Sequence, residues 1–127
     1  MRHLEPPSLG SVATLNEIAS ACNHATMRLY DLRVTVERIE GGSVCGLQVG
    51  DYFEVTESSR IRIPEGRHFC IYALQSVLPL LPAKQRQLPE SDWLEQDSLV
   101  ACPDPDERVV MRIERIGERT LRTEDLT

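Results

Sequence analysis

The sequence predicts an α+β domain in which a small, mostly antiparallel sheet, flat or curled, packs with one core helix and one added N-terminal helix. Two observations predict this class. Short segments in which apolar and polar residues alternate recur along the chain, as expected for strands with one buried face. Between them lie two longer segments, one amphipathic and one largely apolar, that are typical of helices.

The first helix is predicted over residues 14–29. Thr14 and Glu17 fit a capping box, in which the two side chains satisfy free N–H groups at the start of a helix. Residues 1–13 contain helix-breaking proline and glycine and are expected to form a flexible tail. The apolar residues that follow recur at helical spacing: Leu15, Ile18, Ala19, Cys22, Ala25 and Leu29.

Five strands are predicted, and the first is the clearest. Leu32, Val34 and Val36 alternate with Arg33 and other polar residues, as in a strand with one buried face. The predicted strand segments are "DLRVTVERIE", "DYFEV", "RIRIP", "SLVAC" and "RVVMRIERI".

The core helix is predicted over residues 67–78, with Pro79 bending or ending it and Pro82 stopping it. Residues 82–97 then form a long polar connection. A connection of this length in a small domain is either a mobile flap or contains a short turn of helix.

Length and charge limit the organisation and the partners. The 127 residues, of which 41% are hydrophobic, fit one domain over residues 14–116, followed by a flexible tail at 117–127. The net charge of −6 argues against a broad nucleic-acid or membrane-binding surface, which needs a basic face. No secretory signal or membrane span is recognisable, so we expect a cytoplasmic protein with reduced thiols.

Three cysteines are placed at the ends of predicted elements, at Cys45, Cys70 and Cys102. If the strands flank the core helix, these thiols converge, and His68 could add a fourth ligand for zinc or iron. Inert packing is the alternative, because free cysteines are often buried and no C-x-x-C pair is present. Cys22, on the stripe of the first helix, is expected to pack.

Arg60, Arg62 and Arg67 precede the core helix and could hold a small anion with the helix start. The alternative is plain strand alternation, with the first two arginines pointing to water. Gly50 and Asp51 are expected to form a turn before a strand.

Asp104, Asp106 and Glu107 form an acidic cluster in a proline-rich turn and are expected to be solvated. Paired carboxylates perform acid–base chemistry only in a cleft that separates their pKa values.

The order of these motifs resembles a family of small uncharacterised bacterial proteins. The resemblance covers residues 31–116, which leaves the N-terminal helix as an addition. It gives weight to three of the cysteines as a set and implies no reaction. The residues that carry the resemblance are Cys45, Gly46, Val49, Gly50, Asp51, Phe53, Cys70, Leu78, Pro79, Cys102, Pro103, Asp104 and Pro105.

Two functions follow from these patterns. The first is a small accessory or binding protein, a subunit or partner of a metabolic enzyme that binds another protein or self-associates as a homo-oligomer. It rests on the lack of a complete catalytic motif and on the added amphipathic helix. The alternative is a metal- or thiol-dependent enzyme that uses Cys45, Cys70 and Cys102.

Overall fold

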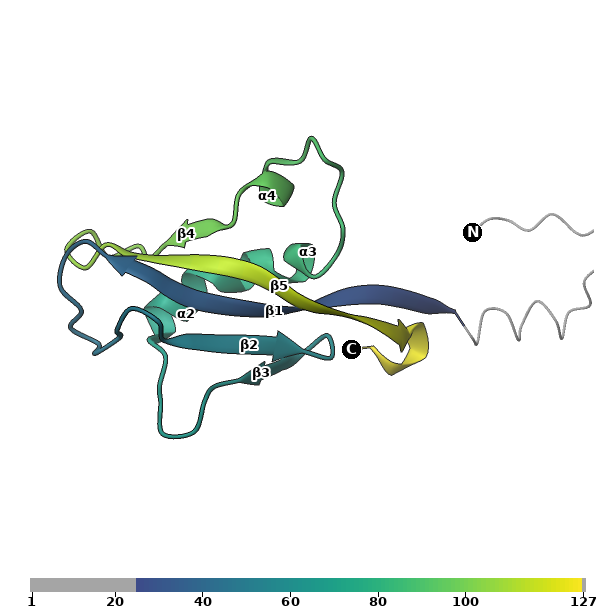
Figure 1. The fold of residues 1–127 in the computed structure, drawn as a ribbon, viewed down its shortest axis with the longest axis horizontal. Helices are drawn as coiled ribbons and strands as arrows, with labels where there is room; N and C mark the ends of the chain where they lie inside the picture. The colour runs from purple at the N-terminus through teal and green to yellow at the C-terminus, as the bar shows by residue number, and fades with distance from the viewer. Residues whose placement is uncertain (1–24, 127) are drawn as a thin grey trace, which may run out of the picture.

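A computed structural model describes residues 25–126 and contains one five-stranded sheet with the strand order β3-β2-β1-β5-β4 (Figure 1). Every neighbouring pair of strands is antiparallel, and the sheet is open. This confirms the predicted α+β class. The elements are β1 (Thr26–Ile39), β2 (Tyr52–Thr56), β3 (Arg60–Arg62), α2 (Ile71–Val77), the 3-10 turn η1 (Leu78–Leu80), α3 (Leu81–Lys84), α4 (Trp93–Gln96), β4 (Leu99–Ala101), β5 (Val109–Arg122) and the 3-10 turn η2 (Thr123–Asp125).

The central feature of the sheet is the pairing of β1 with β5, each 14 residues long. Their register runs from Thr26 opposite Arg122 to Ile39 opposite Val109. The other strands pair with only part of this length, so one end of β1 and β5 continues beyond them as a two-stranded ribbon (Figure 1).

The two faces of β1 differ as its alternation predicts. Leu32, Val34 and Val36 are fully buried. On the opposite face, Arg33 donates to Glu54 on β2 at 2.6 Å. This solvent-facing side is further crossed by ion pairs between neighbouring strands, namely Arg112 with Glu37 and Arg119 with Asp31. On the other face, where the ribbon extends, Arg28 pairs with Glu118.

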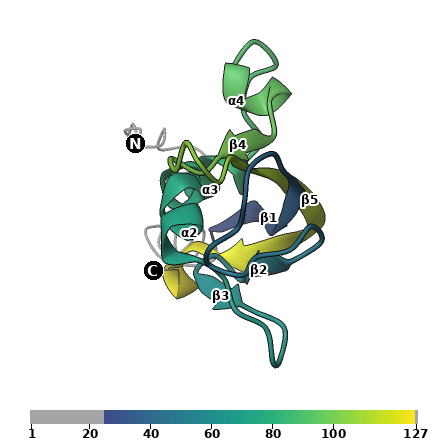
Figure 2. The ribbon, with the colours of Figure 1, turned by 90° about the vertical axis from the view of Figure 1, so that its left-hand side faces the viewer.

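α2, η1 and α3 follow one another along the apolar face of the sheet, whereas α4 stands away from it beyond β4 (Figure 1 and Figure 2). Ala73, Val77 and Leu81 pack in one cluster with the buried residues of β1 and with Phe53 of β2. The ring of Phe69 meets that of Phe53 edge to face, with 4.8 Å between centroids. None of the helices in the described part of the chain is both long and apolar enough to cross a membrane.

The two ends of the chain differ from the prediction. The expected tail 1–13 and most of the expected helix 14–29 lie outside the described residues, but Thr26–Leu29 belong to β1. The prediction of a flexible tail over 117–127 is also wrong, because β5 continues to Arg122. Each segment becomes a strand by pairing with the other, which outweighs the weak local preference of either.

The core helix is shorter than predicted and is followed by further helical turns. It begins at Ile71, with Cys70 as its N-cap, and ends at Val77, before Pro79. The prediction that Pro82 stops the helix is wrong, because Pro82 lies in the first turn of α3. Backbone N–H groups in a first turn have no partner within the helix, so a proline there removes no helical hydrogen bond. The connection over 82–97 contains α4, which confirms the short turn of helix.

The turn before β2 is held by Asp51, as predicted. Gly50 has a φ of +96°, and Gln48 N–H donates to the Asp51 carboxylate at 2.9 Å. The carboxylate also accepts from Arg67. Burial opposes ionisation of Asp51, but the bonds from Gln48 and Arg67 outweigh it and hold the pKa of this carboxyl below its ordinary value.

We predict that Asp51→Asn lowers the free energy of unfolding at pH 7 by about 1–3 kcal/mol, because it removes a buried charged acceptor. The lowered pKa stabilises the fold above the unfolded value near ~4 and this contribution disappears as the pH falls through the folded pKa. The deficit of the variant should therefore shrink in acid, as measured by urea unfolding between pH 7 and pH 3. A deficit that stays constant or grows in acid contradicts this role.

Candidate functional site

Three segments of distant sequence meet at one end of the molecule, which faces the viewer in Figure 2. Ile39 at the end of β1 lies opposite Val109 at the start of β5. The loop after β1 and the turn before β5 therefore emerge together, and the start of α2 lies beside them. These segments contain the three cysteines that the sequence singles out.

The carboxylate of Glu107 joins the turn to the loop. It is 6% exposed and accepts from Val44 N–H at 2.5 Å and from Cys45 N–H at 3.4 Å. The sequence-based expectation that Glu107 is solvated is wrong, because its carboxylate accepts from two backbone N–H groups that lie 63 and 62 residues earlier in the chain. Asp104 supports it locally by accepting from Asp106 N–H at 2.9 Å.

Gly41 allows the same two segments to approach. Its N–H donates to the Glu107 carbonyl at 2.9 Å. A Cβ at this position would lie 1.8 Å from the Asp106 carbonyl oxygen, whereas a Cβ on Gly42 would meet nothing within 4 Å. The first glycine of the pair is therefore required by close backbone contact, and the second is not.

The cysteines gather at this end without forming the predicted metal site. Cys70 and Cys102 belong to the hydrophobic core, and the half-buried Cys45 packs against it. The imidazole Nε2 of His68 lies 2.7 Å from the backbone oxygen of Cys45. Across residues 25–126, no three His, Cys, Asp or Glu side chains are arranged to hold a metal ion, so the predicted ligand set is not assembled.

The chemistry of these thiols is limited by burial. Desolvation is the main cause that raises the pKa of Cys102, with smaller contributions from Cys70 and Glu107, while a hydrogen bond from the Asp104 backbone opposes them. A raised pKa disfavours the thiolate, which is the nucleophilic form. Packing therefore explains Cys102 better than reactivity does.

The predicted anion site is not assembled either. Arg60 and Arg62 both pair with Glu57, which follows β2. Arg67 pairs with Asp51, which precedes β2. The two carboxylates lie at opposite ends of a strand, about 20 Å apart along it at ~3.3 Å per residue, so the arginines do not converge.

Apolar side chains are exposed around the meeting point of the three segments. Val44, Ile71 and Tyr72 are 93%, 68% and 62% exposed. Tyr72 also lines a surface cavity of about 360 Å³ together with Pro103 and Pro105. We call these five residues the apolar end.

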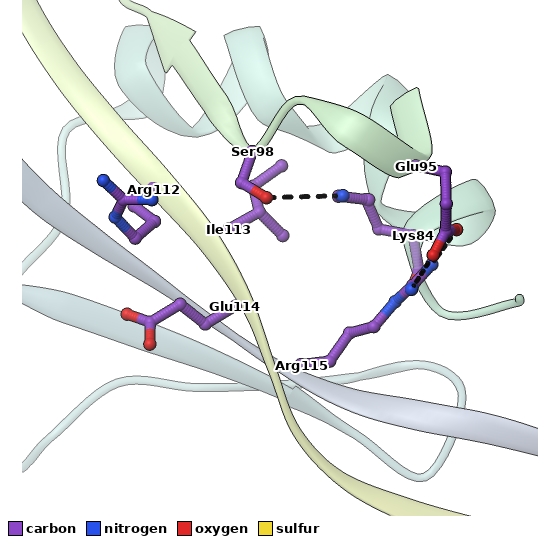
Figure 3. Close-up of a pocket in the computed structure, with 7 residues that line it drawn as sticks. All are labelled: Lys84, Glu95, Ser98, Arg112, Ile113, Glu114 and Arg115. Atoms are coloured by element: carbon purple, nitrogen blue, oxygen red, sulfur yellow. Dashed lines mark hydrogen bonds and ion pairs between the residues drawn. The ribbon is translucent and has the colours of Figure 1, made fainter. Parts of the chain in front are cut away.

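A second site lies between α3, the segment around α4 and β5 (Figure 3). It is a cavity of about 370 Å³, and most of its lining side chains are polar or charged. The lining residues are Lys84, Glu95, Ser98, Arg112, Ile113, Glu114 and Arg115.

Lys84 is the buried lysine of this cavity and is 3% exposed. Its Nζ donates to the Leu94 carbonyl at 2.7 Å and contacts Ser98 Oγ at 3.5 Å. Beside it, Arg115 binds both oxygens of Glu95, at 2.5 and 2.8 Å, and lowers the pKa of Glu95 to about 2.

Sequence reasoning missed this site, because a lysine in a polar connection gives no sign of burial. The one signal available is that Lys84 is the only lysine in the chain.

The comparisons with known proteins give no further guide, since no family model, curated protein or solved structure matches this chain.

We predict that Gly41→Ala lowers the free energy of unfolding by about 1–3 kcal/mol or more, because the added methyl group forces the two backbones apart. Gly42→Ala is the matched control and should be neutral or stabilising by up to about 1 kcal/mol. Chemical denaturation measures both. Equal effects of the two substitutions would show that the close approach at Gly41 does not hold this end together.

Proposed function

We propose that this protein is a small accessory protein that binds protein surfaces through the apolar end, and that the first such surface is a second copy of the chain. The observation that carries the proposal is the exposure of Tyr72 and Ile71 on α2 and of Val44 on the loop after β1, two segments that share one end of the fold. Tyrosine and aliphatic side chains of this kind form the centre of protein interfaces.

Single exposed apolar residues are common on protein surfaces and need no explanation. These differ because the segments that carry them are held in place. Glu107 holds the backbone of Val44, Gly41 brings the loop against the turn, and Tyr72 lies beside Pro103. A contact surface whose backbone is already ordered loses less conformational entropy on binding, which favours association.

The charges around the apolar end suit pairing with a copy of itself. Asp104 and Asp106 flank the apolar side chains on the turn. His68 precedes α2, and so does Arg67, which pairs with Asp51 but remains 46% exposed. A two-fold symmetric contact repeats each pairing twice, so acidic groups of one copy can face basic groups of the other. This complementarity offsets part of the repulsion expected from a net charge of −6.

We propose that the protein works in the cytoplasm. Its resemblance to small bacterial proteins is one of sequence motifs. In that compartment Cys45, Cys70 and Cys102 remain free thiols. The alternative, a thiol- or metal-dependent enzyme, has no observation in its favour, because Cys102 is buried with a raised pKa and the ligand set is not assembled.

We predict that the wild-type protein forms dimers at micromolar concentrations and that Tyr72→Asp shifts it to monomer, because the substitution places a charge at the centre of the contact. Size-exclusion chromatography with light scattering over a concentration series measures the mass. Circular dichroism of the variant confirms that the fold is retained.

Ile116→Asp is the matched control, since Ile116 is an apolar side chain, 41% exposed, on β5 outside the apolar end. It should leave the dimer unchanged. A wild-type protein that is monomeric throughout the series overturns the proposal, and so does a dimer that Tyr72→Asp leaves intact.

A further inference from the structure

Lys84 combines features that a structural lysine does not need. It is buried within a cavity, and its amino group contacts a backbone carbonyl and a hydroxyl. No carboxylate of the described residues forms an ion pair with it. The nearby carboxylate of Glu95 is occupied by both guanidinium nitrogens of Arg115. A buried ammonium without a compensating charge is costly.

The surroundings favour the neutral amine. Burial lowers the pKa of Lys84, and the positive charge of Arg115 lowers it further, while Glu95 and Asp97 act in the opposite direction. The other charged groups that line the cavity are Arg112, which is paired with Glu37, and Glu114. A neutral amine at ordinary pH is a nucleophile, whereas an ammonium is not.

The contacts of the amino group are compatible with a neutral amine. One hydrogen donates to the Leu94 carbonyl at 2.7 Å. The Ser98 hydroxyl can accept the second hydrogen or donate to the lone pair, but at 3.5 Å this contact is long, and a molecule in the cavity can replace it. The volume of about 370 Å³ is at the lower end of the range for small-molecule sites.

We propose that Lys84 is a nucleophilic amine that condenses with a small aldehyde or ketone bound in this cavity. In the reaction Nζ attacks the carbonyl carbon and forms a carbon–nitrogen bond. The carbonyl oxygen takes up the two amine protons and leaves as water, so that an imine remains on Lys84. No oxidant or reductant is consumed.

The competing explanation is that Lys84 only ties α3 to the segment after α4 by its bond to Leu94. A lysine with that role alone would remain an ammonium and would react with carbonyl compounds no faster in the folded protein than in the unfolded one. The two explanations therefore differ in the rate and in the pH profile of imine formation.

The experiment uses the full chain with glyoxylate as the carbonyl probe and cyanoborohydride to reduce the imine to a stable secondary amine. Because the chain has a single lysine, peptide mass spectrometry separates a Lys84 adduct from one on the α-amino group. At pH 7 we expect labelling of Lys84 to be several-fold faster in folded than in urea-unfolded protein, because the lowered pKa of Lys84 raises the fraction of free amine.

Lys84→Met should remove the adduct, and circular dichroism checks its fold. In that background Gln87→Lys places a lysine on an exposed position nearby, and this residue should label slowly at pH 7 with the profile of an ordinary amine. The pH profile of the wild-type protein stands even if Lys84→Met fails to fold. A rate at Lys84 equal to or below that of the unfolded chain, or no adduct at all, overturns the proposal.

Discussion

The antiparallel pairing of β1 with β5 is the constraint on which the remaining structure depends. It fixes Ile39 opposite Val109, and this register alone brings the loop after β1 against the turn before β5. The contacts of Glu107 with Val44 and of Gly41 with Glu107 follow from that placement, because they join these two segments. The apolar end is thus a consequence of strand register.

The same pairing also explains the cavity around Lys84. β4 pairs with β5 as far as Arg112, and Ile113 N–H still donates to the Ser98 carbonyl at 2.8 Å, so β4 leaves the edge of β5 just before Arg115. Arg115 extends from this edge and donates to the backbone oxygens of Lys84 and Arg86 at 2.9 and 2.7 Å. One arginine therefore holds the end of α3, keeps Glu95 ionised and maintains a positive charge next to the only lysine.

Much of the sheet is predictable from the sequence because alternation is a local signal. Leu32, Val34 and Val36 are buried as their spacing predicts, and Phe53 joins them from β2. The length of β1 is not predictable in this way. Thr26–Leu29 fit a helical pattern when considered alone and become a strand only through their pairing with the end of β5.

The candidate sites are less predictable than the fold, because they are made by contacts between distant segments. The motifs of Cys45, Cys70 and Cys102 do lie at one end of the molecule. The surface of that end is formed by exposed apolar side chains and not by the cysteine sulfur atoms. Glu107 is buried and accepts a hydrogen bond from the loop after β1, although the polar residues around it in the sequence suggest a solvated turn. Burial of Lys84 depends on α4 and β5, which no pattern around residue 84 reveals.

The central functional claim is that the apolar end is a contact surface between proteins. Hydrogen–deuterium exchange of the wild-type protein, measured at low and at high micromolar concentration, tests it most directly. We expect the backbone amides within residues 43–46, 71–72 and 103–106, prolines excepted, to exchange more slowly at the higher concentration, while the exchange of the β3 amides does not change. Concentration-independent exchange in all three segments, or protection confined to β3 or to the β1–β5 ribbon, would contradict the claim.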